Sequence, residues 1–215
     1  YRRLRLTESL PMNSVALSAK MKSESPLTPE EAKRRLPAIT RIVDENLRAG
    51  VLQLTTEAPE YFWTVPASTS GFHHSICRQE CRLWAHTLMV YTGVESLIDS
   101  YKARFSVEPD HARAAALLHD MRKNGSPENP SDKSVSDHDF QMANIVRQHG
   151  AFPEVVADSI AERMGAWYDG PEPSSPLAEL VHNADMLASM ANATVAIPGP
   201  VPEELEALGV DKADL

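Results

Sequence analysis

The chain has 215 residues, of which 42% are hydrophobic and 24% are charged, and its formal net charge at pH 7 is −9. This composition is that of a globular protein with a sizeable core, and it excludes the disordered and fibrous classes. The negative charge disfavours a broad nucleic-acid-binding surface, which would need a basic face. No run approaches the ~20 apolar residues of a membrane span, so we expect no membrane partner.

The beginning of the chain and its cysteines indicate the cellular compartment. Residues 1–27 are expected to form a flexible arm, and their arginines are not followed by the apolar core of a secretory signal. Cys77 and Cys81 are the only cysteines in the sequence. Two thiols favour reduced side chains over a disulfide framework, and we therefore predict a cytoplasmic protein.

A helical extension is predicted over residues 28–58. Thr28-Pro29-Glu30-Glu31 has the hydroxyl cap, first-turn proline and acidic first turn of a helix start. Apolar residues then recur at helical spacing as far as Gly50, which predicts one helix kinked at Pro37. The extension packs over the rest of the protein, forms a homodimer contact or covers a pocket, and the sequence does not choose among these. Residues 57–76, rich in Ser, Thr, Pro and aromatic side chains, are predicted to form a loop.

The remainder of the chain is predicted to be all-α. It shows no alternating pattern of a strand and no internal repeat. We expect the His119-Asp120 doublet in the last turn of the helix over residues 109–124. Ser136 is expected to cap the helix over residues 136–149. The acidic tail, residues 196–215, is expected to contain a solvated short helix. Five helices are predicted after the loop, over residues 78–103, 109–124, 136–149, 153–167 and 175–190.

Four residues on these helices form a candidate metal site. Asp185 lies in an apolar helical stretch, and Asp120 follows Leu117-Leu118-His119, so both carboxylates need a partner if they are buried. One divalent cation shared with two imidazoles would satisfy both; two independent His–Asp hydrogen bonds are the alternative. Imidazole and carboxylate ligands suit Mn, Fe, Co, Ni or Zn better than Ca. The four candidate ligands are His86, His119, Asp120 and Asp185.

The order of these motifs resembles that of the HD-domain superfamily of metal-dependent phosphohydrolases, over roughly residues 60–192. The resemblance implies an all-α HD domain at residues 59–195, in which the four candidate ligands hold the metal. It implies cleavage of phosphate esters, whereas a smaller branch of the superfamily uses two irons to oxidise substrates. The motifs are His86, Leu117-Leu118-His119-Asp120-Met121-Arg122-Lys123, Asp137-His138 and Val181-His182-Asn183-Ala184-Asp185-Met186-Leu187-Ala188.

Arg163 is a departure from the two-metal members of this superfamily. Those members carry two additional histidines; His138 matches the first, but Arg163 stands before Met164-Gly165 where close relatives carry the second. A guanidinium stays protonated and offers no lone pair to a metal. We therefore expect one divalent ion, which is Mn, Fe, Co, Ni, Zn or Mg, and the di-iron oxygenase function is disfavoured.

Several further residues are candidates for catalysis or substrate binding. Lys123 could stabilise charge on a phosphoryl group, and its alternative role is that of a lysine at a helix C-terminus. Arg163 could bind phosphate, and its alternative is an arginine on a surface helix. Arg78 and Arg82 would lie on one helix face with His86 as phosphate clamps, or form a solvated stripe paired with acids. The predicted catalytic residues are Asp120, Lys123 and His138, and His138 could act as a general acid or proton relay because no second metal binds it. The predicted substrate-binding residues are Arg78, Arg82, Arg163, His74 and His182. His182 precedes Asp185 by one helical turn, so its alternative role is to orient a metal ligand.

The function predicted from the sequence is metal-dependent hydrolysis of a phosphate ester, of a nucleotide or another small phosphorylated metabolite. The alternative is a catalytically silent nucleotide-binding or regulatory module that keeps the fold, because a fold does not determine a function. A di-iron oxygenase is the third and weakest option.

Overall fold

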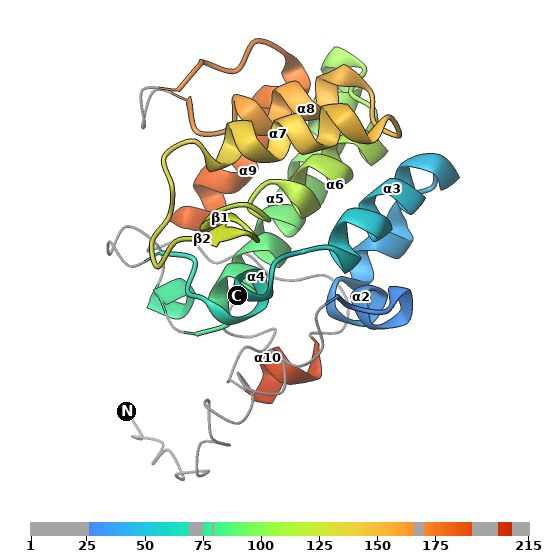
Figure 1. Ribbon diagram of the computed structural model, residues 1–215. Helices are drawn as coiled ribbons and strands as arrows, with labels where there is room; N and C mark the ends of the chain where they lie inside the picture. The colour runs from blue at the N-terminus through green and yellow to red at the C-terminus, as the bar shows by residue number, and fades with distance from the viewer. Residues whose placement is uncertain (1–25, 69–74, 79, 166–169, 191–201, 208–215) are drawn as a thin grey trace, which may run out of the picture.

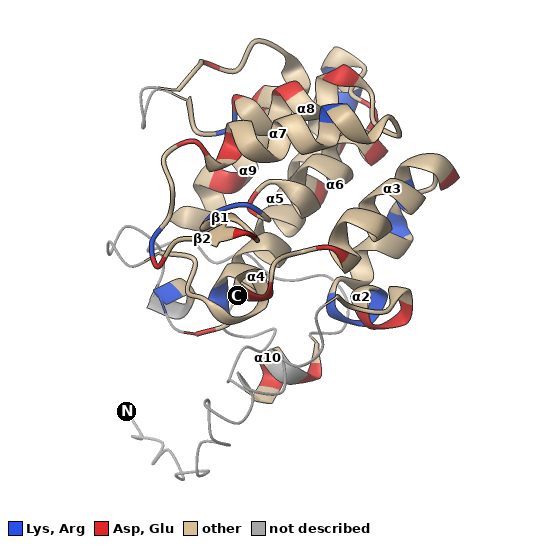
Figure 2. Ribbon diagram, in the orientation of Figure 1, with Lys and Arg blue, Asp and Glu red and all other residues tan. Residues whose placement is uncertain are grey.

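A computed structural model describes residues 26–68, 75–78, 80–165, 170–190 and 202–207 of the chain (Figure 1). The fold is all-α, as predicted. Within the described residues the only strands are β1 (Gly125–Ser126) and β2 (Asn129–Pro130), which pair antiparallel with Gly125 opposite Pro130. No described helix is long and apolar enough to cross a membrane. Acidic and basic residues are interspersed over the described ribbon (Figure 2).

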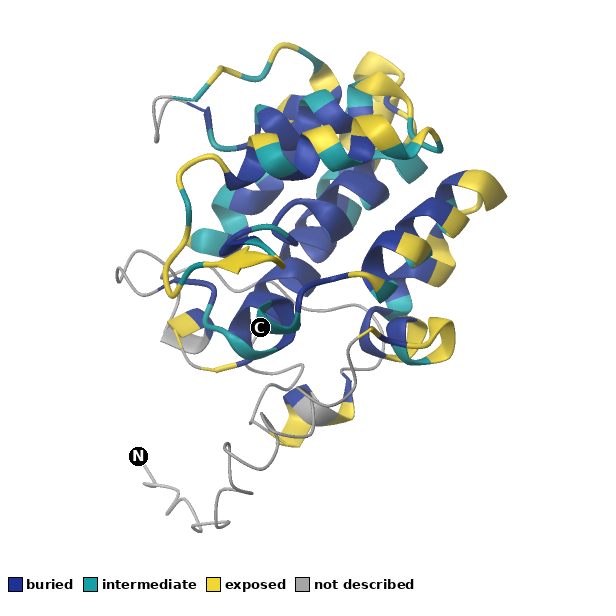
Figure 3. Cartoon of the chain, viewed as in Figure 1, coloured by how far each residue is buried: buried dark blue, intermediate teal, exposed yellow. Residues whose placement is uncertain are grey.

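The centre of the fold is α5 (Arg82–Phe105), which packs against α6 (Pro109–Leu118) and α9 (Pro176–Ser189). Helices α7 (His138–His149) and α8 (Glu154–Ala161) pack on each other, and α8 also contacts α6 and α9. Buried residues follow the inner faces of these helices (Figure 3).

Gly93 allows α5 and α9 to approach closely. A Cβ at this position would lie only 3.1 Å from the Cα of Ala184. Such a contact is tighter than ordinary packing, so any larger residue would push the two helices apart. The close approach matters for the site because α5 carries His86 and α9 carries Asp185.

The helical extension consists of three pieces, so the prediction of one kinked helix was wrong. They are α2 (Pro29–Arg35), the 3₁₀ helix η1 (Pro37–Arg41) and α3 (Glu45–Thr56). Thr28 caps α2 as predicted. Pro37 lacks an N–H and disfavours helical backbone at Leu36, which explains why α2 ends before it. Helix α3 and η1 pack on α6, so the extension covers the bundle.

The segment predicted as a loop contains a short helix, α4 (Glu60–Thr64), and the 3₁₀ helix η2 (Ser75–Arg78). Helix α4 forms because Phe62 and Trp63 are buried, and Trp63 packs edge-to-face on Trp84 of α5. The hydroxyl of Tyr61 donates hydrogen bonds to the carbonyl oxygens of Gly125 (2.5 Å) and Met121 (3.2 Å). Through Tyr61, helix α4 therefore stabilises the turn that follows α6.

Four predicted helix boundaries were wrong, each because tertiary contacts or turn geometry decide them. Helix α5 begins at Arg82, after Cys81 in the left-handed conformation. Helix α6 ends at Leu118, so the doublet lies just beyond it. Asp137, not Ser136, is the N-cap residue of α7, and α8 already ends at Ala161.

Other boundaries were predicted correctly. Gly150 ends α7 with a φ of 75°, and the Ser175 side chain caps α9 by accepting from the N–H of Ala178. The acidic tail contains α10 (Glu203–Ala207), although its Leu205 is buried. The predicted domain limits stay predictions, and residues 1–25 of the flexible arm predicted at residues 1–27 lie outside the described residues.

Candidate metal centre

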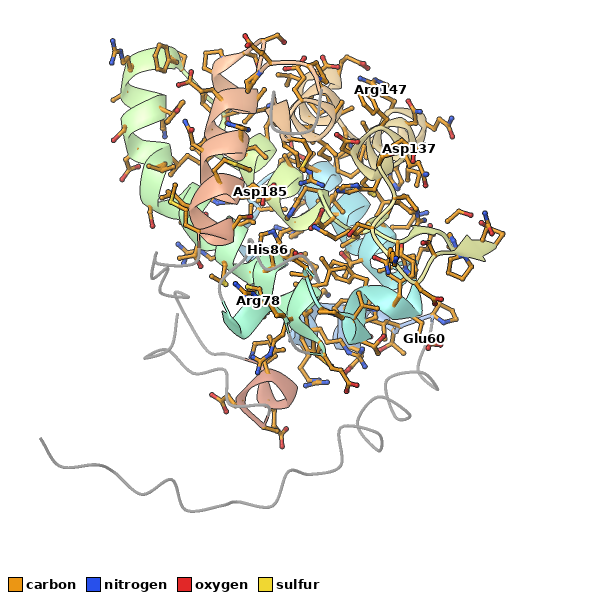
Figure 4. The ribbon with its side chains drawn as sticks, turned by 90° about the vertical axis from the view of Figure 1, so that its left-hand side faces the viewer. Glu60, Arg78, His86, Asp137, Arg147 and Asp185 are labelled. Carbon is orange, nitrogen blue, oxygen red and sulfur yellow. The ribbon has the colours of Figure 1, made fainter. Side chains whose placement is uncertain are left out.

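His86, His119 and Asp185 meet in the interior of the bundle. One ligand atom from each lies within 4.8 Å of the others, and all three residues are buried. Nε2 of His86 lies 3.0 Å from Oδ1 of Asp185, and both side chains are labelled in Figure 4. Burial lowers the pKa of His86, although Asp185 opposes this shift. The imidazole is therefore neutral at pH 7, which is the form that binds a metal.

His119 has the hydrogen bonding of a metal-ligating imidazole. Its Nδ1 lies 2.7 Å from the carbonyl oxygen of Ala116. Because that oxygen only accepts, Nδ1 carries the proton and Nε2 presents its lone pair. Within the part of the chain that the structure describes, buried Nε2 makes no hydrogen bond. An oriented, buried nitrogen of this kind fits a divalent cation held with His86 and Asp185.

Asp120 lies beside this group with both oxygens paired to cations. Arg163 Nη2 donates to Oδ1 at 2.6 Å, and Lys123 Nζ donates to Oδ2 at 2.7 Å. Burial alone would raise the pKa of Asp120, but these two cations hold it well below its usual range. Oδ2 lies 3.5 Å from Nε2 of His119 and 3.8 Å from Nε2 of His86. Each oxygen has a second lone pair that could bind a metal. Coordination of a metal by Asp120 therefore stays a prediction.

Arg163 lies inside the site, not on the surface, so the surface alternative was wrong. It follows α8 and is 1% exposed. Its Nη1 donates to Oδ2 of Asp185 at 2.8 Å, and Nη2 lies 2.6 Å from Nε2 of His138. Burial would lower the pKa of Arg163, but the nearby carboxylates raise it. The guanidinium is thus a permanent cation that bridges two carboxylates and an imidazole.

His138 and His182 contact Arg163 from opposite ends. Nδ1 of His138, the first residue of α7, lies 2.6 Å from the carbonyl oxygen of Val135, so its Nε2 accepts from Arg163. Nδ1 of His182 on α9 lies 2.5 Å from the backbone carbonyl oxygen of Arg163. The predicted roles of His138 in proton transfer and of His182 in substrate binding stay predictions.

The remaining predicted residues are dispersed. Arg78 is exposed in η2, so the prediction that it shares one helix face with Arg82 and His86 was wrong. Arg82 is buried in the first turn of α5, four residues before His86, as predicted. Figure 4 shows Arg78 on the same side of the fold as His86. His74 lies outside the described residues. Binding of substrate by Arg78, Arg82 and His74 stays a prediction.

Asp139 was missed by the sequence analysis. It is 3% exposed, accepts a hydrogen bond from the N–H of Phe140, and its charge helps to raise the pKa of Arg163. The signal that could have identified it is the run Asp137-His138-Asp139, in which an acid follows a candidate site histidine.

The comparisons with known proteins agree with this geometry. The family model described as HD domain matches residues 83–190, which is half of the chain and includes His86, His119 and Asp185. No curated protein and no solved structure matches the chain. HD domains bind divalent metals, and most of them are metal-dependent hydrolases that belong to a phosphohydrolase superfamily. The chain belongs to the HD domain family.

Proposed function

We propose that the protein is a single-metal phosphohydrolase that cleaves a phosphate ester of a nucleotide or another small phosphorylated metabolite. The observation that carries the proposal is the buried, unbonded Nε2 of His119, oriented by Ala116 toward the group formed with His86 and Asp185. A divalent ion held there supplies Lewis acidity, which lowers the pKa of water and stabilises charge on a phosphoryl group.

Arg163 supports one metal and not two. Its Nη2 is shared by Oδ1 of Asp120 and Nε2 of His138, so both acceptors already face a cation. A guanidinium cannot be displaced by deprotonation near neutral pH, because its pKa is raised further by the carboxylates. The position next to the metal group therefore carries a fixed positive charge, which argues against the di-iron oxygenase.

Lys123 is the second cation of the site. Its ammonium donates to Oδ2 of Asp120, and the side chain is almost completely buried. A lysine held in this way can balance the negative charge that develops on a transferred phosphoryl group. His138 is the proposed proton carrier for the leaving group, a role that requires its Nε2 to give up the hydrogen bond from Arg163 and take a proton instead.

A catalytically silent module is the second candidate, and a specific observation favours it. Asp120 is paired with Arg163 and Lys123, and Asp185 is paired with Arg163. Both buried carboxylates thus have cationic partners without a metal, so the fold does not require one to satisfy them.

Metal titration and phosphate release distinguish these functions. Chelator-treated protein would receive Mn, Fe, Co, Ni, Zn or Mg separately, followed by a panel of nucleotides and sugar phosphates. We expect one ion per chain and phosphate release with at least one metal. His119→Ala should lose metal binding and phosphate release. The control is His149→Ala, which should keep both, because wild-type His149 contacts Gln53 (Nε2 to Oε1, 3.2 Å) and not the metal group. Metal bound without turnover supports the silent module, two irons per chain support the oxygenase, and absence of metal binding refutes the metal centre.

A further inference from the structure

His182 contacts the residue that bridges the two carboxylates, but through its backbone. It lies on α9, one helical turn before Asp185, and its Nδ1 donates to the carbonyl oxygen of Arg163 at 2.5 Å. Arg163 follows the end of α8 in a turn, where helix carbonyl groups lack intrahelical partners. His182 satisfies one such carbonyl and so ties the turn to α9.

The imidazole also fits the turn by its shape. Gly165 has a φ of +55°, and a Cβ there would lie 3.0 Å from Cε1 of His182. Glycine meets both demands, since it adopts left-handed backbone at little cost and leaves room for the ring. The ring therefore packs against the turn while its Nδ1 holds the Arg163 carbonyl. This close fit is not needed for a histidine that only contacts substrate.

The side chain of Arg163 makes demanding contacts that depend on this turn. Its guanidinium donates to Asp120 Oδ1 at 2.6 Å and to Asp185 Oδ2 at 2.8 Å in a buried environment. Buried ion pairs offset the cost of desolvation only when their geometry is good. Helix α9 thus holds Arg163 twice, by its backbone through His182 and by its side chain through Asp185.

We propose that His182 is a positioning residue that fixes the backbone of Arg163 and thereby keeps the guanidinium between Asp120 and Asp185. The consequence for catalysis rests on the proposed single-metal function, whereas the positioning itself does not require a metal. This role differs from both roles expected from the sequence, which were a substrate contact and the orientation of a metal ligand. It makes the hydrogen-bond donor at residue 182, and not its charge, the property that matters.

Two substitutions separate the donor from the ring. His182→Asn keeps an N–H donor near the position of Nδ1 but loses the ring, whereas His182→Phe keeps an aromatic ring but loses the donor. The experiment uses the full chain with ¹⁵N-labelled arginine in the presence of a chelator. NMR would measure how fast the Nη protons of Arg163 exchange with water, and Arg163→Lys would identify their signals. Arg113, which is paired with Glu95 and Asp110, is the internal reference.

We expect exchange of the Arg163 protons to be roughly tenfold faster in His182→Phe, equivalent to the loss of one hydrogen bond, and close to wild type in His182→Asn. The Arg113 protons should not change in either variant. Unchanged exchange of Arg163 in folded His182→Phe would overturn the proposal, as would equal acceleration in both variants. If His182→Phe fails to fold, His182→Leu provides the same comparison. Because the measurement uses neither metal nor activity, its outcome is independent of the proposed function.

Discussion

Arg163 donates a hydrogen bond from Nη2 to Oδ1 of Asp120 at 2.6 Å, and neither side chain is more than 1% exposed. A pair this deeply buried is costly to desolvate and costly to break, because removing one partner leaves an uncompensated charge. The second carboxylate on the same guanidinium, Asp185, raises that cost.

Replacing Arg163 by Met should therefore destabilise the metal-free protein strongly. We expect the free energy of unfolding to fall by about 3–5 kcal/mol, as for other broken buried pairs. Urea unfolding with a chelator measures this. Arg147→Met is the matched control, since Arg147 pairs with Glu154 and Asp158 on the surface of α7 (Figure 4) and should cost at most about 1 kcal/mol. Equal losses in both variants would contradict the buried pair.

Stability should depend on pH through the same carboxylates. Asp120 and Asp185 have a pKa well below the ordinary 3.8, so they contribute stability above that pH and lose it as the pH falls toward their folded pKa. The reason is that the unfolded chain takes up protons that the folded chain does not. His86, with its pKa lowered from 6.5, adds an earlier decline that begins as the pH falls below 6.5.

The measurement is the free energy of unfolding in urea, taken for metal-free protein between about pH 7.5 and about pH 3. Asp185→Asn should flatten the slope below pH 4. Asp158→Asn, which alters an exposed carboxylate paired with Arg147, should leave most of the slope unchanged. A wild-type curve that is flat over the whole range would show that these groups titrate alike in both states.

Lys123→Gln should reduce turnover more than stability. The substitution removes a cation beside Asp120 while it keeps much of the side-chain volume, and we expect kcat to fall by roughly 100-fold. Steady-state phosphate release measures the effect. Lys133→Gln removes an exposed lysine of the following loop and should leave kcat unchanged. If Lys123→Gln retains full turnover, the ammonium has no part in the reaction.

Tyr61→Phe tests whether α4 supports the turn that carries the doublet. The hydroxyl donates to the carbonyl oxygens of Gly125 and Met121, and its loss should lower the free energy of unfolding by about 1 kcal/mol. Tyr101→Phe removes a hydroxyl that donates to Glu179 and accepts from Asn183 on a partly exposed side chain, and it should cost less because water can replace both partners. Thermal unfolding of the two variants gives the comparison, and the opposite ranking would refute the role of α4.

The sequence predicted the elements whose signals are local. Thr28 and Ser175 were recognised as helix caps because a hydroxyl followed by proline is a short-range pattern. The candidate metal group was predicted because an aspartate in an apolar helix, such as Asp185, demands a partner if it is buried. The effect of Pro37 was predicted as a kink, because apolar residues recur at helical spacing on both sides of it. In the structure the helix ends before Pro37.

The position of Arg163 could not be predicted in the same way. Its residue type excluded a metal ligand, but its burial depends on where α8 ends and on how α6 and α9 pack around that end. The same holds for His182, whose partner is a backbone carbonyl in a turn with no sequence signature beyond Gly165. Contacts of this kind arise from tertiary packing, which overrides local propensity.

His86 and Asp185 lie on opposite ends of the matched domain, roughly a hundred residues apart along the chain, and closing a loop of that length carries a large entropic cost. An unfolded chain therefore rarely brings His86, His119 and Asp185 together, and a metal ion held by all three would bind the folded chain in preference. Because the ion binds the folded state, it stabilises that state by mass action. At concentrations above Kd, the melting temperature should rise with the logarithm of the ion concentration. A bound ion would thus join α5 and α9, which lie at the two ends of the matched domain.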